Sequence, residues 1–188
     1  MTLRLGPPCL DWLPSYAHAL ETGWSPDNTQ NVSAEQLAFL KCDPAAFLNS
    51  LLAQHGVVTL PDGSTRPKLP SLRLWLWDGE FCGTISMRWQ EGSDALPPHV
   101  LGHIGYAVVP WKRSKGYASE AFRVMLNEAR RIGLGRIEIT VDRDNLASRR
   151  VIQKNGGHLI EEFVNEIFGP DIRLRYVVSV EDRSRGGA

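Results

Sequence analysis

The sequence has little of several features that would assign a function at once. It has only three cysteines, Cys9, Cys42 and Cys82, and no Cys-x-x-Cys pair, so we expect neither a disulfide framework nor a zinc site. Its five histidines show no metal-ligand spacing, and we predict no metal. No apolar run approaches the ~18 residues of a transmembrane helix, and the first residues do not form a signal peptide. A cytoplasmic location and no membrane partner are therefore expected.

Net charge is also lacking, because 21 Lys and Arg balance 21 Asp and Glu. This balance argues against a general nucleic-acid binder. The charge is nevertheless uneven, since residues 111–154 carry 11 basic against 5 acidic residues. A local basic zone of this kind suits a small polyanion.

The length of 188 residues, with 43% hydrophobic and 22% charged residues, is typical of one globular domain that needs no disulfides. We expect a single domain over residues 1–182 and a frayed tail over residues 183–188. The tail is rich in Gly, Ser and Arg.

A strand, a basic turn and a helix follow one another in the middle of the chain. Residues 104–109 are apolar and largely β-branched, and Pro110 ends that strand. From Ala118 apolar residues recur at helical spacing as far as Gly133. The turn between them carries Arg113 and Lys115, and Gly116 lets the backbone approach a ligand closely. Free N–H groups at the helix start favour an anion there.

A second strand and helix come directly after the first pair. Residues 136–141 read as a strand, and Asn145 and Ser148 lie at the start of a helix that ends at the Gly156-Gly157 pair. Asp144 is the better helix cap by residue type, and Asn145 could share that role.

These two segments resemble the GCN5-related N-acetyltransferases, the GNAT superfamily. Arg113-x-x-Gly116-x-Ala118 fits the Arg/Gln-x-x-Gly-x-Gly/Ala signature of that family's motif A, and Asn145-x-x-Ser148 matches the motif that follows it. The combination is similar to a bacterial branch of predicted acetyltransferases. The resemblance implies a mixed α/β GNAT fold with a central twisted mixed sheet of about six to seven strands. It also implies flanking helices and a splayed pair of central strands.

The other expected elements agree with that order. An Asp78-Gly79 hairpin joins strands 72–77 and 81–89, and residues 61–70 are expected to be a loop. The strand 72–77 alternates between an aliphatic face and a face with Arg73, Trp75 and Trp77. The second face is either covered by a helix or part of an aromatic acceptor pocket. Further strands are expected at 3–5, 159–164 and 172–180, and further helices at 13–21, from 33 and at 43–56.

The resemblance implies acetyl-CoA as co-substrate, with pantetheine inserted between the diverging strands 104–109 and 137–141. A backbone N–H of Val108 or Val109 would then face the acyl oxygen. The expected cofactor-binding residues are Val108, Val109, Arg113, Ser114, Lys115, Gly116, Tyr117, Ala118, Asn145 and Ser148.

The general acid departs from the family pattern. Many relatives have a Tyr seven residues after the motif Asn, where this chain has Ile152. Ser148 is the substitute that the resemblance suggests, and Tyr106, Tyr117 and Tyr176 are rivals.

The general base is equally open. His103 lies near the place where some relatives carry a catalytic Glu, and its ordinary pKa suits neutral pH. Glu138, Glu80 or a chain of water molecules are the alternatives, and a histidine at a strand start can also be purely structural.

The function expected from these features is direct transfer of an acetyl group from acetyl-CoA to a primary amine, on a small molecule or a protein. The alternative is a catalytically weak CoA-binding regulatory or interaction module. A nucleotide phosphotransferase is disfavoured because residues 113–118 lack the Gly-Lys-Ser/Thr ending of a P-loop. The sequence leaves the oligomeric state open, and the resemblance adds that relatives are often homodimers.

Overall fold

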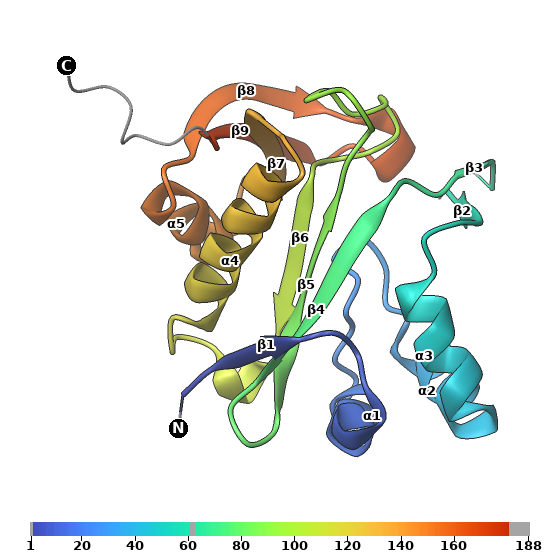
Figure 1. Cartoon of the computed structure of the whole chain (residues 1–188). Coiled ribbons are helices and arrows are strands. Elements are labelled where there is room, and N and C mark those ends of the chain that lie inside the picture. The colour runs from blue at the N-terminus through green and yellow to red at the C-terminus, as the bar shows by residue number, and fades with distance from the viewer. Residues whose placement is uncertain (1, 61–62, 181–188) are drawn as a thin grey trace.

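The chain folds as two antiparallel sheets with helices around them (Figure 1). The structure is a computed structural model that describes residues 2–60 and 63–180. The expected tail over residues 183–188 lies outside the described residues, as do the last two residues of the expected domain. Within the described part, no helix is long and apolar enough to cross a membrane.

The first sheet has the strand order β1-β4-β5-β6. Its strands are β1 (Arg4–Gly6), β4 (Ser71–Trp77), β5 (Phe81–Arg88) and β6 (Ile104–Val108). The expected hairpin at Asp78 and Gly79 is confirmed, and Gly79 has a φ of 110°, which glycine adopts without strain. In the register, Leu72 faces Met87 across β4 and β5.

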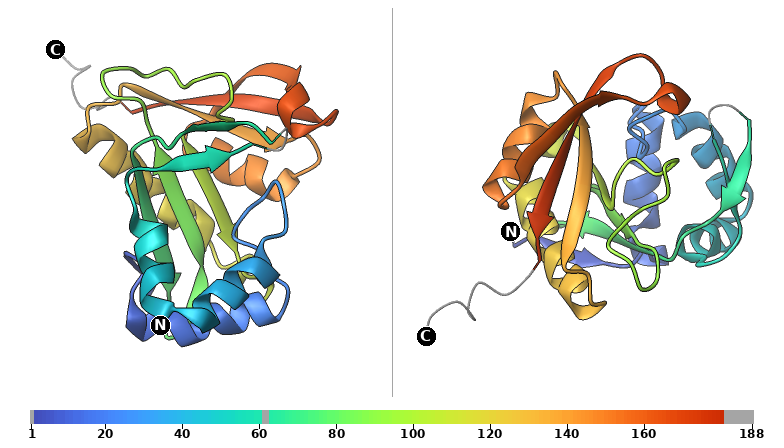
Figure 2. Two further views of the ribbon diagram at one scale, coloured as in Figure 1. Left: turned by 90° about the vertical axis from the view of Figure 1, so that its right-hand side faces the viewer. Right: turned by 90° about the horizontal axis from the view of Figure 1, so that it is seen from above.

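The second sheet has the order β7-β9-β8. Its strands are β7 (Arg136–Asp142), β8 (His158–Val164) and β9 (Ile172–Ser179). It lies across one end of the first sheet (Figure 2). The two sheets meet just before β6, where the N–H of His103 donates to the carbonyl of Glu138 at 2.8 Å.

The expected mixed α/β fold is observed, and the expected splay is present between β6 and β7. The residues just before β6 contact the middle of β7, and the two strands form no ladder with each other in the described chain. Gly102 makes the contact possible, because a Cβ there would lie 3.2 Å from Ile139 Cα. The strands therefore belong to two sheets rather than to one continuous sheet, and every ladder in the described residues is antiparallel.

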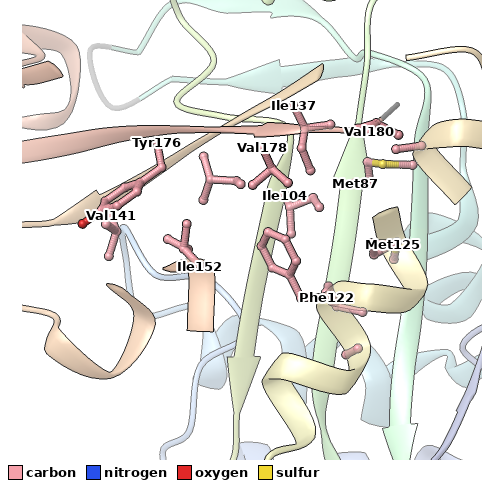
Figure 3. Close-up of a cluster of buried hydrophobic side chains, with 14 of the residues drawn as sticks. Met87, Ile104, Phe122, Met125, Ile137, Val141, Ile152, Tyr176, Val178 and Val180 are labelled. Carbon is pink, nitrogen blue, oxygen red and sulfur yellow. The ribbon is translucent and has the colours of Figure 1, made fainter. Parts of the chain in front are cut away.

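Two hydrophobic cores lie on opposite faces of the first sheet. One packs α4 (Tyr117–Arg131) and α5 (Leu146–Lys154) against both sheets, with Phe122, Met125 and Ile152 fully buried (Figure 3). The pattern of apolar residues after Ala118 predicts this helix face, and the prediction is confirmed.

The other core packs three N-terminal helices against the opposite face. They are α1 (Leu13–Glu21), α2 (Ser33–Cys42) and α3 (Pro44–Leu52). Trp75 is 1% exposed and stacks on Tyr16 with ring centroids 4.5 Å apart. The aromatic face of β4 is thus covered by helices at Trp75, as one of the two alternatives expects.

The remaining elements are short. The expected loop over residues 61–70 contains the short strand β3 (Thr65–Pro67), which pairs with β2 (Val57–Thr59) outside both sheets. Three short 3-10 turns complete the described chain: η1 (Leu10–Trp12), η2 (Pro110–Lys112) and η3 (Glu166–Phe168).

Candidate active site

In the part of the chain that the structure describes, one edge of β6 has no strand partner. The alternation of backbone groups along β6 determines which of them face this free edge. The N–H of Arg88 donates to the carbonyl of His103 at 2.9 Å, and the N–H of Val109 donates to the carbonyl of Cys82 at 3.0 Å. In an antiparallel pair every second residue bonds to the neighbouring strand. Tyr106 and Val108 therefore direct their backbone groups to the free edge.

This alternation shows which of Val108 and Val109, the two candidates from the sequence, has a backbone N–H at the free edge. Val109 N–H is already bonded within the sheet, and the Val109 side chain is fully buried. Val108 N–H faces the free edge, and its carbonyl accepts from Arg113 Nε at 3.3 Å. Of the two, only Val108 has a donor that an acyl oxygen could reach.

The basic turn before α4 places backbone N–H groups at an open helix start. Gly116, the residue before the helix, has a φ of 83°, and no side chain caps the helix there. Ser114 also has a positive φ, of 63°, which is uncommon for a residue other than glycine. Arg113 and Lys115 are exposed on this turn. A helix start with free N–H groups and nearby cations is suited to a phosphate.

A buried ion pair fixes this turn to the β4–β5 hairpin. Lys112 Nζ lies 2.7 and 2.9 Å from the two carboxylate oxygens of Asp78 and 2.6 Å from Glu80 Oε1. Tyr117 donates to Asp78 Oδ2 at 2.6 Å. Burial alone would raise the pKa of Asp78, but the hydrogen bonds from Lys112 and Tyr117 hold that pKa well below its usual range. The hydrogen bond to Asp78 raises the pKa of Tyr117 to about 12.

Sequence reasoning missed this network. It interprets Asp78 only as a turn residue, and it offers Tyr117 as an acid and Glu80 as a base. In the structure both side chains are bonded to groups that hold the turn in place. The only signal in the sequence was an acidic residue in a hairpin turn, which is common at turns for local reasons.

Two hydroxyl groups meet between β6 and α5. Tyr106 Oη lies 2.6 Å from Ser148 Oγ, and either atom can be the donor. Burial raises the pKa of Tyr106 to about 12, although the hydrogen bond with Ser148 lowers it in part, so the phenol keeps its proton at neutral pH. The structure therefore brings together two of the residues that the sequence offers as rival acids.

Asn145 is the N-cap of α5. Its Oδ1 accepts from the N–H of Ser148 at 3.0 Å, which is the structural role that the sequence left open. Asp144, the better cap by residue type, does not cap this helix. The cap orients the first turn of α5 and so sets the position of the Ser148 hydroxyl.

Tyr176 and Ile152 lie in the core rather than beside these hydroxyls. Tyr176 is 1% exposed on β9, near Val141 (Figure 3). Its hydroxyl makes no hydrogen bond in the described chain. A group enclosed in this way has no path to a leaving thiolate, so the geometry does not support Tyr176 as the acid.

His103 is completely buried where the two sheets meet. Its Nδ1 accepts from the N–H of Glu138 at 2.9 Å, so in the neutral ring the proton sits on Nε2. Burial lowers the pKa of His103. The one nitrogen that could take a proton is therefore already an acceptor, which favours the structural role that the sequence left open.

Glu138, the other candidate base in this region, has carboxylate oxygens 3.5 Å from Arg136 and 4.0 Å from Arg175. Its main-chain groups hold His103. These contacts direct the side chain to the arginines of the second sheet, away from the free edge of β6.

Comparison with known proteins agrees with this geometry. The family model described as an acetyltransferase (GNAT) domain matches residues 55–158, more than half of the chain. No curated protein matches the chain. RimJ of Mycobacterium smegmatis, in complex with CoA-disulfide, is similar in structure with a TM-score of 0.65 and 18% identity, over 94% of this chain and 81% of RimJ.

Two further solved structures share the fold. An acetyltransferase of the GNAT family from Bacillus anthracis has a TM-score of 0.64 and 17% identity, with 97% of each chain covered. The yncA protein of Salmonella typhimurium, with its cofactor acetyl-CoA, has a TM-score of 0.56 and 17% identity, over 100% of this chain and 99% of that one. At these identities the likeness shows the fold alone.

Proposed function

The chain belongs to the GNAT acetyltransferase family, and on that premise we propose that it transfers an acetyl group from acetyl-CoA directly to a primary amine. The observation that carries the proposal is the uncapped start of α4 next to the free edge of β6. The first feature suits a diphosphate, and the second offers backbone hydrogen bonds to a pantetheine chain. The yncA structure contains acetyl-CoA, and we propose the same co-substrate here.

The proposed cofactor site follows the chain from the turn to α5. Backbone N–H groups at Gly116 and Ala118 face the diphosphate, and Arg113 and Lys115 supply positive charge. The backbone of Tyr106 and Val108 pairs with the pantetheine amides in the way an added strand would. In this proposal the thioester lies beside the hydroxyls of α5 and β6.

In the proposed reaction the amine nitrogen forms a bond to the acyl carbon, and the carbon–sulfur bond breaks. Val108 N–H donates to the oxygen that gains charge. The Ser148 and Tyr106 hydroxyls, bonded to each other at 2.6 Å, supply the proton that the departing thiolate takes up. Because Tyr106 is protonated at neutral pH, the pair has a proton to give.

The amine proton leaves to solvent in this proposal. His103 has its acceptor nitrogen occupied, and Glu80 and Glu138 are held in ion pairs. A water chain, the remaining alternative from the sequence, needs no dedicated side chain. The proposed setting is the cytoplasm, and a homodimer remains a prediction for light scattering to test.

The test is to incubate the protein with acetyl-CoA and a panel of amines and to measure the release of free thiol. Thiol release that depends on the amine, with a matching N-acetylated product by mass spectrometry, is the expected result. CoA binding without turnover for any amine would favour the regulatory module instead. Absence of any CoA-dependent stabilisation would overturn the proposal.

A further inference from the structure

Two arginines lie on the same face of the first sheet, on neighbouring strands. Arg73 in β4 faces Ser86 in β5, and Arg88 in β5 faces Ser71 in β4. Arg73 and Arg88 are thus diagonal cross-strand neighbours, whose side chains lie within roughly 7–8 Å of each other. They share this face with Trp75, so they project toward the helices that cover it. Both side chains are half-buried.

Neither guanidinium has a partner that would explain its burial. The guanidinium groups of Arg73 and Arg88 make no hydrogen bond or ion pair with any residue in the described chain. Desolvation lowers the pKa of each, and Arg73 lowers the pKa of Arg88 further by repulsion. Lys68 adds a third cation near Arg73, and Asp27 is the carboxylate close enough to influence both arginines.

Partly desolvated like charges cost free energy unless an anion is bound to them. Among the described residues Asp27 forms no ion pair with either arginine, and its Oδ1 accepts hydrogen bonds from Thr29 and Gln30 within its own loop. A fold that keeps two such arginines side by side, without forming a pair with a carboxylate, is suited to an external anion. Guanidinium groups bind carboxylate and phosphate in two-point geometry.

Arg88 lies beside β6, the strand whose free edge holds the cofactor in the proposed function, and Arg73 lies one strand further from that edge. A Cβ placed on Gly105 would lie 3.3 Å from Arg88 Nη2, so this guanidinium packs directly on the glycine. Asn28, next to Asp27 in the loop between α1 and α2, donates to the carbonyl of Tyr106 at 3.0 Å. In Figure 2 that loop and the N-terminal helices lie on the side of the sheet opposite to α4.

We propose that Arg73 and Arg88 bind an anionic oxyacid group on the acceptor, so that the substrate is a small amine that also carries a carboxylate or a phosphate. The inference rests on the proposed acetyl transfer. The arginines approach β6 from the face of Gly105, whereas Tyr106 points to the opposite face and packs on Phe122. The acceptor would enter from the arginine side, and the leaving thiolate would meet the Tyr106 and Ser148 hydroxyls on the other side.

The binding test uses saturating CoA in every sample, so that the effect of the anionic CoA on the melting temperature is the same in all samples being compared. Malonate, inorganic phosphate and the uncharged malonamide are compared by thermal unfolding of the wild type and of Arg73→Gln/Arg88→Gln. Malonate or phosphate should raise the melting temperature of the wild type, and the double variant should lose that shift. The larger of the two shifts identifies carboxylate or phosphate. Arg123→Gln removes an exposed arginine of α4 and should keep the shift.

The turnover test uses matched acceptors with acetyl-CoA. Phenylalanine is paired with phenethylamine, and O-phosphoethanolamine with ethanolamine. Loss of charged hydrogen bonds typically costs tenfold or more, so the charged member of at least one pair should have kcat/KM at least about tenfold higher. Arg88→Gln should abolish that preference through KM and leave the melting temperature without ligand unchanged or higher, because a like-charge repulsion is removed.

Two results would overturn the inference. One is an equal anion shift in the wild type and the double variant. The other is turnover in which the uncharged acceptors are used as well as the charged ones. Either outcome leaves acetyl transfer intact if CoA still stabilises the protein. If CoA does not stabilise it, the proposed function fails, and a repeat of the anion test without CoA then judges the arginine pair by the same criterion.

Discussion

Replacement of Gly116 by valine should abolish CoA binding without unfolding the protein, and Gly133 provides a matched control. Both glycines flank α4, with φ of 83° and 86°, and a Cβ at either would meet nothing within 4 Å. The cost of valine is therefore backbone strain alone, about 1–2 kcal/mol at each position. The two variants should lose similar stability, although only Gly116 lies at the predicted diphosphate site.

The ligand effect separates the two positions. At a CoA concentration 100 times the dissociation constant, a single site stabilises the native state by ~2.7 kcal/mol. For a chain of this size 1 kcal/mol corresponds to ~2–4 °C, so the wild type and Gly133→Val should gain roughly 5–10 °C with CoA. Gly116→Val should gain almost nothing, because a valine that moves the backbone out of the left-handed region redirects the N–H groups of the turn.

Thermal unfolding by circular dichroism, with and without CoA, measures both effects, and calorimetry gives the affinity. Retention of the full CoA shift in Gly116→Val would refute the placement of the diphosphate at this turn. Loss of the shift in Gly133→Val as well would show that strain at either end of α4 disrupts the fold, and the reasoning from local geometry would be wrong.

Three further outcomes follow from the same contacts. Tyr106→Phe and Ser148→Ala should each lower kcat by ~10²-fold. The double variant should lose little more activity, because the two hydroxyls act together. Full kcat in both single variants across the pH range would show that another group is the acid. A variant with Cys82→Ala and the other two cysteines replaced should keep most of its turnover. The Cys82 thiol is fully buried, and burial raises its pKa to about 12. An acetylated cysteine, detected by mass spectrometry of the trapped enzyme, would contradict direct transfer. The pKa of His103 is lowered in the native state, so its contribution to stability is present above about pH 6.5 and is lost as the pH falls below that value. His103→Asn, whose Oδ1 can still accept the Glu138 N–H, should flatten the acid limb of urea unfolding and keep kcat; loss of activity with folding intact would restore His103 as the base.

The sequence predicts the elements around the site because their signals are local. The hairpin at Asp78 and Gly79, the strand that ends at Pro110 and the start of α4 at Gly116 each depend on a few adjacent residues. Turn conformation, helix capping and apolar periodicity act over that range. The same locality explains why two short motifs in the right order are enough to indicate the family.

The expectations that failed, or that stayed open, involve partners from distant segments. Whether Val108 or Val109 faces the free edge depends on the register of β6 with β5, which a shift of one residue would reverse. The meeting of Tyr106 with Ser148 depends on how α5 packs beside β6. The occupied Nδ1 of His103 depends on where β7 crosses the first sheet, and no pattern within one segment contains that information.

The arginine pair gives the clearest division between the two levels. The sequence by itself placed Arg73 on the aromatic face of its strand, because side chains alternate across a strand. Only the tertiary structure decided that Arg88 shares that face and that Trp75 is covered by helices. It also decided that neither guanidinium hydrogen-bonds or ion-pairs within residues 2–60 and 63–180. The alternation of side chains is a property of a single strand. The charge on a sheet face depends on several strands together, and their register and the helices that cover them are fixed only when the chain folds.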